Sequence, residues 1–162
     1  MAKFDVADTV RDLDEGKVPD WITAHLKLYL ESGGRDGHYW DTTFAGGKGL
    51  TPCLILTTVG RRSGQKRPMP LIYGTVGKAL VVIGSKGGAD TQPAWYWNLL
   101  SEPMVDVQAG ADCFTAKARI SSGAERDALW TMMVDVYPPY RDYQGKTSRQ
   151  IPVVVLERVT EE

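Results

Sequence analysis

The feature that most constrains the fold is a series of short β-rich segments joined by tight turns. Six such segments are predicted as strands: residues 53–59, 71–76, 79–85, 104–108, 113–120 and 151–159. Gly77-Lys78 and Ala109-Gly110-Ala111 supply hairpin turns within the series. Strands that follow one another through hairpins run antiparallel, so a doubly wound parallel sheet is disfavoured.

Apolar residues at helical spacing predict helices around these strands, in residues 6–16, 21–32, 92–100 and 122–136. Asp20 is the expected N-cap of the second helix, and Gly33-Gly34 ends it. The pattern Ser122-x-x-Glu125 predicts a capping box at the start of the fourth helix. Residues 35–51 are rich in glycine without a period, which indicates a loop. The whole pattern indicates an α+β, mainly β fold, an antiparallel barrel or sheet flanked by helices.

The length of 162 residues fits one domain, with residues 1–50 as N-terminal helices and loop and residues 51–162 as the barrel core. No apolar run reaches the ~18 residues that a membrane span needs. Cys53 and Cys113 are far apart and form no disulfide framework, which favours a reduced, cytoplasmic setting. The apolar faces of the N-terminal helices could contact the inner face of the cell membrane, although core packing explains them equally well. The two histidines, His25 and His38, leave little for a metal site, and we expect none.

Positive charge is concentrated in one part of the chain, although the formal net charge is −1. Residues 42–89 contain seven basic residues and no Asp or Glu: Lys48, Arg61, Arg62, Lys66, Arg67, Lys78 and Lys86. An anionic ligand is therefore expected there. The sequence pI is about 6.1 and no nucleic-acid-binding pattern is present, so we expect no nucleic-acid partner.

Two glycine-containing segments are candidate anion sites. The first, residues 57–67, is a strand end followed by a loop bounded by Gly60 and Gly64, with arginines suited to phosphate or carboxylate. It lacks the spacing of a Walker loop, and a charged hairpin tip is an equally good interpretation. The second, residues 84–90, leads into the helix that carries Trp95-Tyr96-Trp97. Three adjacent aromatics cannot all face a core, so one should cover a ligand or an interface; a plain structural turn is the alternative.

Three tyrosines form the third candidate, because Tyr137, Tyr140 and Tyr143 recur every third residue and would share one side of a helix. Their hydroxyls could donate to a carbonyl or nitro oxygen, and their rings could wall an apolar pocket. Simple helix packing explains any one of them equally well. A hydrolytic role for Ser63 or Ser85 lacks a recognisable base, the histidines fit packing or surface roles better than catalysis, and both cysteines are expected to be buried and inert.

Five motifs in series resemble the deazaflavin (F420)-dependent nitroreductase and F420H2-dependent quinone reductase family. They are L-T-T-V-G-R-R-S-G-Q at 56–65, S-K-G-G-A-D at 85–90, P-A-W-Y-W-N-L at 93–99, Y-P-P-Y-R-D-Y-Q at 137–144 and T-x-R-x-I-P-V at 147–153. The resemblance covers residues 50–159, whereas the first 50 residues match loosely. It implies a split β-barrel of the FMN-binding-like type with flanking helices. It also implies hydride transfer from reduced F420 to a quinone, nitroaromatic or enone-type acceptor.

The resemblance also implies roles for individual residues. The phosphate and glutamate tail of F420 would be held by Arg61, Arg62, Ser63 and Arg67. Further cofactor contacts would come from Ser85, Lys86, Gly87, Ala94, Trp95, Tyr96, Asn98 and Tyr140. The acceptor pocket and its catalytic hydroxyls would be Ser85, Tyr137, Tyr140 and Tyr143. F420 bears a phosphate and several carboxylates, so the acid-free basic segment suits it.

One position departs from the family pattern, because Ile72 stands where nitro-activating members commonly carry an aromatic residue. That change affects the expected acceptor and leaves fold and cofactor unaffected. Two alternatives keep the fold: a reductase that binds FMN, and a non-catalytic protein that holds a cofactor or a lipid-like ligand. The expected partner is a small-molecule acceptor, and the sequence does not indicate an oligomeric state.

Overall fold

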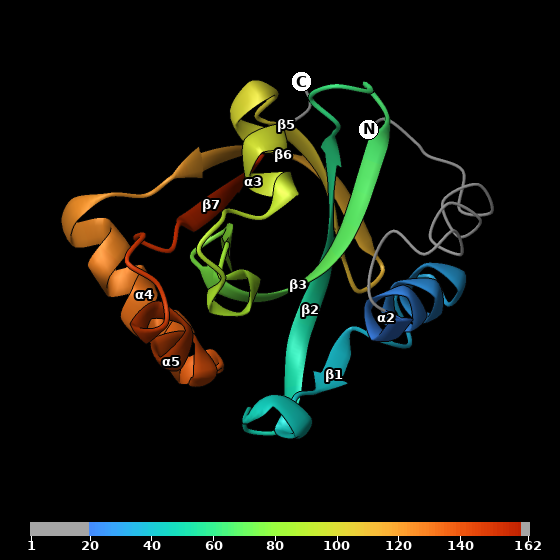
Figure 1. The fold of residues 1–162 in the computed structure, drawn as a ribbon. Coiled ribbons are helices and arrows are strands. Elements are labelled where there is room, and N and C mark those ends of the chain that lie inside the picture. The colour runs from blue at the N-terminus through green and yellow to red at the C-terminus, as the bar shows by residue number, and fades with distance from the viewer. Residues whose placement is uncertain (1–19, 160–162) are drawn as a thin grey trace.

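Seven strands dominate the computed structural model, which describes residues 20–159 (Figure 1). They are β1 (Tyr39–Asp41), β2 (Leu50–Val59), β3 (Lys66–Val76), β4 (Ala79–Ile83), β5 (Met104–Ala109), β6 (Asp112–Ile120) and β7 (Val153–Arg158). The helices of this part are α2 (Asp20–Glu31), α3 (Ala94–Ser101), α4 (Gly123–Val136) and α5 (Pro139–Gly145), with 3-10 turns η1 (Thr43–Ala45) and η2 (Lys86–Gly88). The helix predicted at residues 6–16 lies outside the described residues.

Six of these strands close into an antiparallel barrel in the order β2-β3-β4-β7-β6-β5. The barrel closes where β5 returns to β2, through the pairs Ile55↔Gln108, Leu56↔Val107 and Thr57↔Asp106. β1 pairs only with the start of β2 and lies outside this ring. The expected antiparallel, mainly β fold with flanking helices is confirmed.

Alternation along the strands divides the core into two layers. One set of buried side chains, including Leu54, Val82 and Leu156, packs with Trp95 of α3, which covers one end of the barrel. The neighbouring positions, such as Val81 of β4, face α4 and α5 and pack there against Met133. On the other side of the barrel, α2 lies apart from α4 and α5 (Figure 1).

Helix α2 is attached to the barrel by one buried side chain. Tyr29 is fully buried, and its hydroxyl lies 2.9 Å from the carbonyl oxygen of Cys53 and 3.0 Å from that of Gln108. The same hydroxyl accepts a hydrogen bond of 2.6 Å from the backbone N–H of Gly110. Gly34, directly after α2, approaches Gly110 so closely that a Cβ there would lie 1.8 Å from its carbonyl oxygen. This packing requires glycine at position 34, the second residue of the glycine pair predicted to end the helix.

Three local predictions were wrong. The predicted loop 35–51 contains β1 and η1, because β1 gains its partner from β2 rather than from its own sequence. β3 begins at Lys66 instead of residue 71; Pro68 and Pro70 are tolerated because that half of β3 pairs with β2 alone among the described strands. The Ser122 side chain forms no capping hydrogen bond at α4.

Candidate functional site

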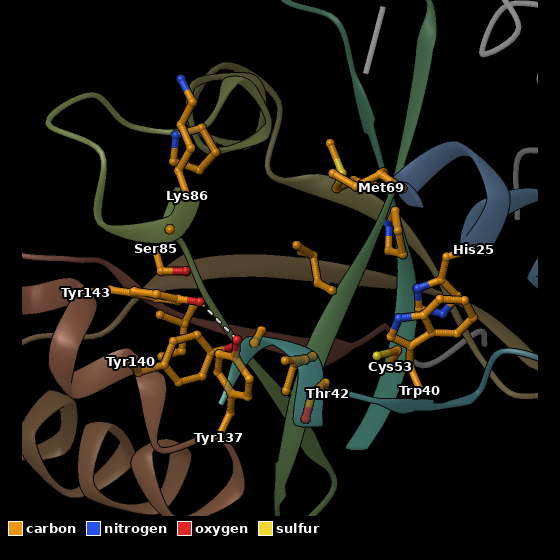
Figure 2. A pocket seen from close by; sticks show the side chains of 18 of the residues that line it. His25, Trp40, Thr42, Cys53, Met69, Ser85, Lys86, Tyr137, Tyr140 and Tyr143 are labelled. Atoms are coloured by element: carbon orange, nitrogen blue, oxygen red, sulfur yellow. Dashed lines mark hydrogen bonds between the residues drawn. The ribbon is translucent and has the colours of Figure 1, made fainter. Parts of the chain in front are cut away.

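A cavity of about 560 Å³ lies beside the barrel, between η2, α5 and the β1–η1 segment (Figure 2). Ser85 and the three tyrosines lie at one side of it, and His25, Trp40 and Cys53 at the other. Its lining is largely apolar, so a bound aromatic ring would be removed from water. Of the site residues predicted from the sequence, the cavity brings together Ser85, Lys86, Gly87, Ala94, Trp95, Tyr137, Tyr140 and Tyr143.

The tyrosine wall consists of Tyr137, which follows α4, and Tyr140 and Tyr143, which lie on α5. The hydroxyls of Tyr137 and Tyr143 are hydrogen-bonded at 2.9 Å, and the rings of Tyr137 and Tyr140 meet edge to face at 4.9 Å. Burial raises the pKa of Tyr137 and of Tyr140 above the ordinary value, so both phenols remain protonated at neutral pH. The Tyr140 hydroxyl has no hydrogen-bond partner within residues 20–159 and can donate to a ligand in the cavity.

The turn after β4, residues 85–87, has the backbone of an anion-binding nest. Ser85 is right-handed (φ −76°, ψ −38°), and Lys86 (φ 46°) and Gly87 (φ 64°, ψ 18°) are left-handed. The three backbone N–H groups of this turn are donated to no group of residues 20–159. Successive N–H groups in such a turn form a concave donor set for an anion or a carbonyl oxygen.

The predicted arginine loop is anchored to Asn98 of α3 rather than to the cavity. Asn98 is buried, and its Oδ1 accepts from the backbone N–H of Arg61 at 3.2 Å and from its Nη1 at 3.0 Å. The Asn98 amide donates in turn to Thr58 Oγ1 at 3.1 Å. Asn98 and Arg61 therefore shape the loop. Arg62 and Arg67 make no ion pair with the described residues and can take an anionic ligand.

Several predicted residues lie away from the cavity lining: Arg61, Arg62, Ser63, Arg67, Tyr96 and Asn98. The three adjacent aromatics of α3 separate as expected from helix geometry. Trp95 is buried and lines the cavity, Tyr96 packs on the barrel core, and Trp97 is 45% exposed. An aromatic of this helix thus faces the candidate ligand site.

Sequence reasoning missed the wall that α2, β1 and η1 contribute. His25 stacks on Trp40 with ring centroids 3.9 Å apart, and its Nε2 donates to the Gly37 carbonyl at 2.8 Å. Burial lowers the pKa of His25, so it is neutral at pH 7 and packs the wall. Thr42 and Phe44 complete this side. The adjacent aromatic residues Tyr39 and Trp40 were the available sequence signal for this wall. The residue on which Trp40 stacks, His25 of α2, is brought there by tertiary packing.

The remaining predictions concern cysteines and Ile72. Cys53 is buried in the cavity wall, where burial raises the pKa of its thiol to about 12 and keeps it unreactive. The prediction for Cys113 was wrong, because its side chain is exposed on β6. Ile72 does line the cavity, as expected for the position that departs from the family pattern.

Within residues 20–159, no cluster of three or more His, Cys, Asp or Glu side chains could hold a metal ion. In the same part of the chain, no helix is both long and apolar enough to cross a membrane.

Similar proteins agree with this geometry. The sequence profile described as F420H(2)-dependent quinone reductase matches residues 21–158. An F420H(2)-dependent quinone reductase of Mycobacterium tuberculosis is 36% identical over 140 residues, which cover 85% of this chain and 89% of that protein. A second, putative one from the same organism is 36% identical over 112 residues, 69% of this chain and 94% of its own length.

Solved structures give the same result. An F420-H2 dependent reductase is 40% identical with a TM-score of 0.62, covering 65% of this chain and 94% of its own. A structure described as a domain-swapped dimer is 34% identical with a TM-score of 0.64, covering 94% and 100%. A heme storage protein from Vibrio cholerae, 15% identical with a TM-score of 0.51 and covering 67% and 82%, shares only the split-barrel fold. Profile, relatives and fold agree: the chain belongs to the F420H2-dependent quinone reductase family, as a reductase whose cofactor is coenzyme F420.

Proposed function

We propose that this chain transfers a hydride from F420H2 to a quinone bound against the tyrosine wall. The observation that carries the proposal is the presence of two complementary donor sets in one apolar cavity. The backbone nest at residues 85–87 supplies one, and the hydroxyls of Tyr137, Tyr140 and Tyr143 supply the other. A ring pair held between them would be oriented and shielded from water, which is what hydride transfer requires.

The cofactor side of the cavity would be formed by Ser85, Lys86 and Gly87, with Ala94 and Trp95 at the start of α3. Arg62 and Arg67, beyond α3, would hold the anionic tail through charge-assisted hydrogen bonds. Asn98 would act by holding Arg61 and thus the shape of the loop. When bound, reduced F420 supplies a hydride.

The acceptor side is formed by the tyrosines. A quinone oxygen gains negative charge as the ring is reduced, and a neutral phenol can stabilise that charge by donating a hydrogen bond. Tyr140 is placed for this, since its hydroxyl has no partner in the described chain. Complete reduction of a quinone consumes one hydride and one proton, and the proton reaches the oxygen through such a hydroxyl from solvent.

Nitroaromatic and enone-type acceptors share the same need for a donor at a developing oxyanion. Ile72 gives the wall an aliphatic side chain at the position where nitro-activating relatives commonly carry an aromatic. We therefore propose quinones as the preferred acceptors and nitroaromatics as poorer ones. The cytoplasmic setting and the peripheral membrane contact also stay predictions. That contact was predicted for the apolar faces of the N-terminal helices, but in α2 the apolar residues Leu26, Tyr29 and Leu30 are buried in a cluster with Ile55, so core packing explains this face.

The decisive experiment measures cofactor and acceptor separately. The purified protein is titrated with F420 and with FMN, and oxidation of F420H2 is then followed with menaquinone analogues, benzoquinones and nitroaromatics. Binding of F420 in preference to FMN, with turnover of quinones, is the expected result. Preference for FMN would contradict the cofactor assignment. F420 binding without oxidation of F420H2 by any acceptor would support the non-catalytic alternative.

A further inference from the structure

Arg149 forms a four-bond clamp on the segment that follows β4. Its Nε donates to the Ala89 carbonyl at 2.7 Å, and its Nη2 donates to the Ser85 carbonyl at 2.8 Å. Its Nη1 donates to the Gly84 carbonyl at 3.2 Å and to Gln92 Oε1 at 2.8 Å. The Arg149 side chain, more than fifty residues away in sequence, therefore contacts this segment both before and after the Lys86-Gly87 part of the nest.

The turn needs such support because its backbone is unusual. Lys86 is the only non-glycine residue with a positive φ in the described chain, and Gly87 and Gly88 follow it at 64° and 85°. A left-handed lysine costs conformational free energy and persists only where the surroundings fix it. Within residues 84–92, the backbone hydrogen bonds that close the turn are two, Gly88 N–H to Ser85 and Ala89 N–H to Lys86. These two bonds are internal to the turn, and one further backbone bond, from the Gly84 N–H to the Pro152 carbonyl at 3.0 Å, ties only the start of the segment to the rest of the fold.

Arg149 is itself fixed against the tyrosine helix. Gln144 of α5 donates from Nε2 to the Arg149 carbonyl at 2.7 Å and accepts from the Ile151 N–H at 2.9 Å. Gly88 closes the arrangement from the other side, since a Cβ there would lie 2.9 Å from the Tyr143 carbonyl oxygen. The clamp thus links the proposed cofactor turn to the helix that carries the acceptor wall.

We propose that Arg149 is a positioning residue that holds the 85–87 nest in its binding geometry and at a fixed distance from the tyrosine wall. It acts through backbone carbonyls, because it does not line the cavity and uses four of its five N–H donors in the clamp. The inference rests on the proposed function of the nest as cofactor contact. A guanidinium is required, since a lysine ammonium keeps the charge but cannot reach both ends of the turn.

The test compares Arg149→Lys and Arg149→Gln with Arg126→Gln as matched control. Arg126 is also half-buried. It donates to the carbonyl of Ile151, two residues after Arg149, at 2.8 Å, but it does not hydrogen-bond to the turn at residues 84–92. Three quantities are measured for each variant: the Kd for F420 by fluorescence, kcat with saturating F420H2 and a quinone, and hydrogen–deuterium exchange of residues 84–92. Thermal melting reports any general loss of stability.

We expect both Arg149 variants to raise the Kd about tenfold, as the loss of one charge-assisted bond network implies, and to lower kcat less. Exchange at residues 84–92 should become faster in both, whereas Arg126→Gln leaves Kd and local exchange unchanged even if it melts earlier. A wild-type Kd in Arg149→Lys would show that only charge matters and would overturn the proposal, as would unchanged exchange in Arg149→Gln. Failure of the wild-type protein to bind F420 would instead overturn the proposed function, and with it the cofactor role of the clamp.

Discussion

At the scale of single residues, the three tyrosines of the wall are not equivalent. The hydroxyls of Tyr137 and Tyr143 are hydrogen-bonded to each other at 2.9 Å, whereas the Tyr140 hydroxyl has no hydrogen-bond partner in the described chain. Tyr140→Phe should therefore leave the melting temperature close to wild type and lower kcat with a quinone by about 100- to 1,000-fold, as loss of one donor to a developing oxyanion implies. Steady-state kinetics at saturating F420H2 measure this. Equal kcat values for Tyr140→Phe and wild type would remove Tyr140 from the reaction.

The arginines of the loop differ in a similar way. Arg61 is engaged with Asn98, but Arg62 and Arg67 have no ion-pair partner in residues 20–159. Arg62→Ala and Arg67→Ala should each raise the F420 Kd about tenfold, roughly 1.4 kcal/mol, with little change in kcat at saturation. Lys78→Ala, in the exposed turn between β3 and β4, is the control and should bind as wild type. Unchanged affinity in both arginine variants would refute the assignment of the anionic tail.

His25 gives a prediction about stability and pH. Burial lowers its pKa in the folded protein below the ordinary value of 6.5, so the unfolded chain binds the extra proton more readily. The stabilisation that neutral His25 contributes is complete above pH 6.5 and is lost progressively as the pH falls below it. Denaturant unfolding at pH 7.5 and pH 5.5 should show this loss in wild type and a smaller one in His25→Gln. An equal loss in both would assign the effect to other groups.

At the scale of elements, hairpins were predictable and long-range partners were not. The turns at residues 77–78 and 109–111 carry their own signal, because the turn residues stand beside the strands that they join. The predicted capping box is absent: the Ser122 side chain makes no cap hydrogen bond, and Glu125 pairs with a residue outside the helix. Arg119 of β6 binds both its carboxylate oxygens, at 2.6 and 2.8 Å, and so the helix start is held by a strand that no local pattern identifies.

The same limit applies to the candidate site. The 85–87 turn and the tyrosines each lie in a contiguous motif, so the sequence could indicate them. The stack of His25 on Trp40 joins α2 to β1 across the barrel surface and has no local signature. The reach of Arg149 to the turn is likewise a consequence of how β7 lies beside β4 in the sheet.

The attachment of α2 to the barrel can be tested at Tyr29. Tyr29→Phe keeps the ring but removes a hydroxyl shared by three backbone groups, leaving buried polar groups unsatisfied. The free energy of unfolding should fall by about 2 kcal/mol. Chemical denaturation measures it, with Tyr39→Phe as control because the Tyr39 side chain is 58% exposed. Equal losses in the two variants would mean that the hydroxyl of Tyr29 does not hold the helix.

At the scale of the whole molecule, fewer basic residues of segment 42–89 lack an acidic partner than the sequence count suggests. Lys48 pairs with Asp135 and Lys66 with Asp106, at 3.1 and 3.0 Å, so acidic residues from elsewhere neutralise part of it. The cations that remain without an acidic partner near α3 include Arg62 and Arg67. A small anionic ligand held at one end of the barrel fits this distribution better than a polyanion spread over the surface.

Such a distribution predicts that salt should affect the two ligands differently. Screening weakens attraction between exposed charges beyond a Debye length of about 10 Å at 0.1 M salt. The Kd for F420 should therefore rise several-fold between roughly 0.05 and 0.5 M salt, because its anionic tail would meet the exposed Arg62 and the half-buried Arg67. The KM for an uncharged quinone should change little, since the wall of Tyr137, Tyr140 and Tyr143 offers hydrogen bonds rather than net charge. In a variant with both Arg62→Ala and Arg67→Ala, the salt dependence of F420 binding should flatten. A slope as steep as that of wild type would place the electrostatic contact elsewhere on the molecule.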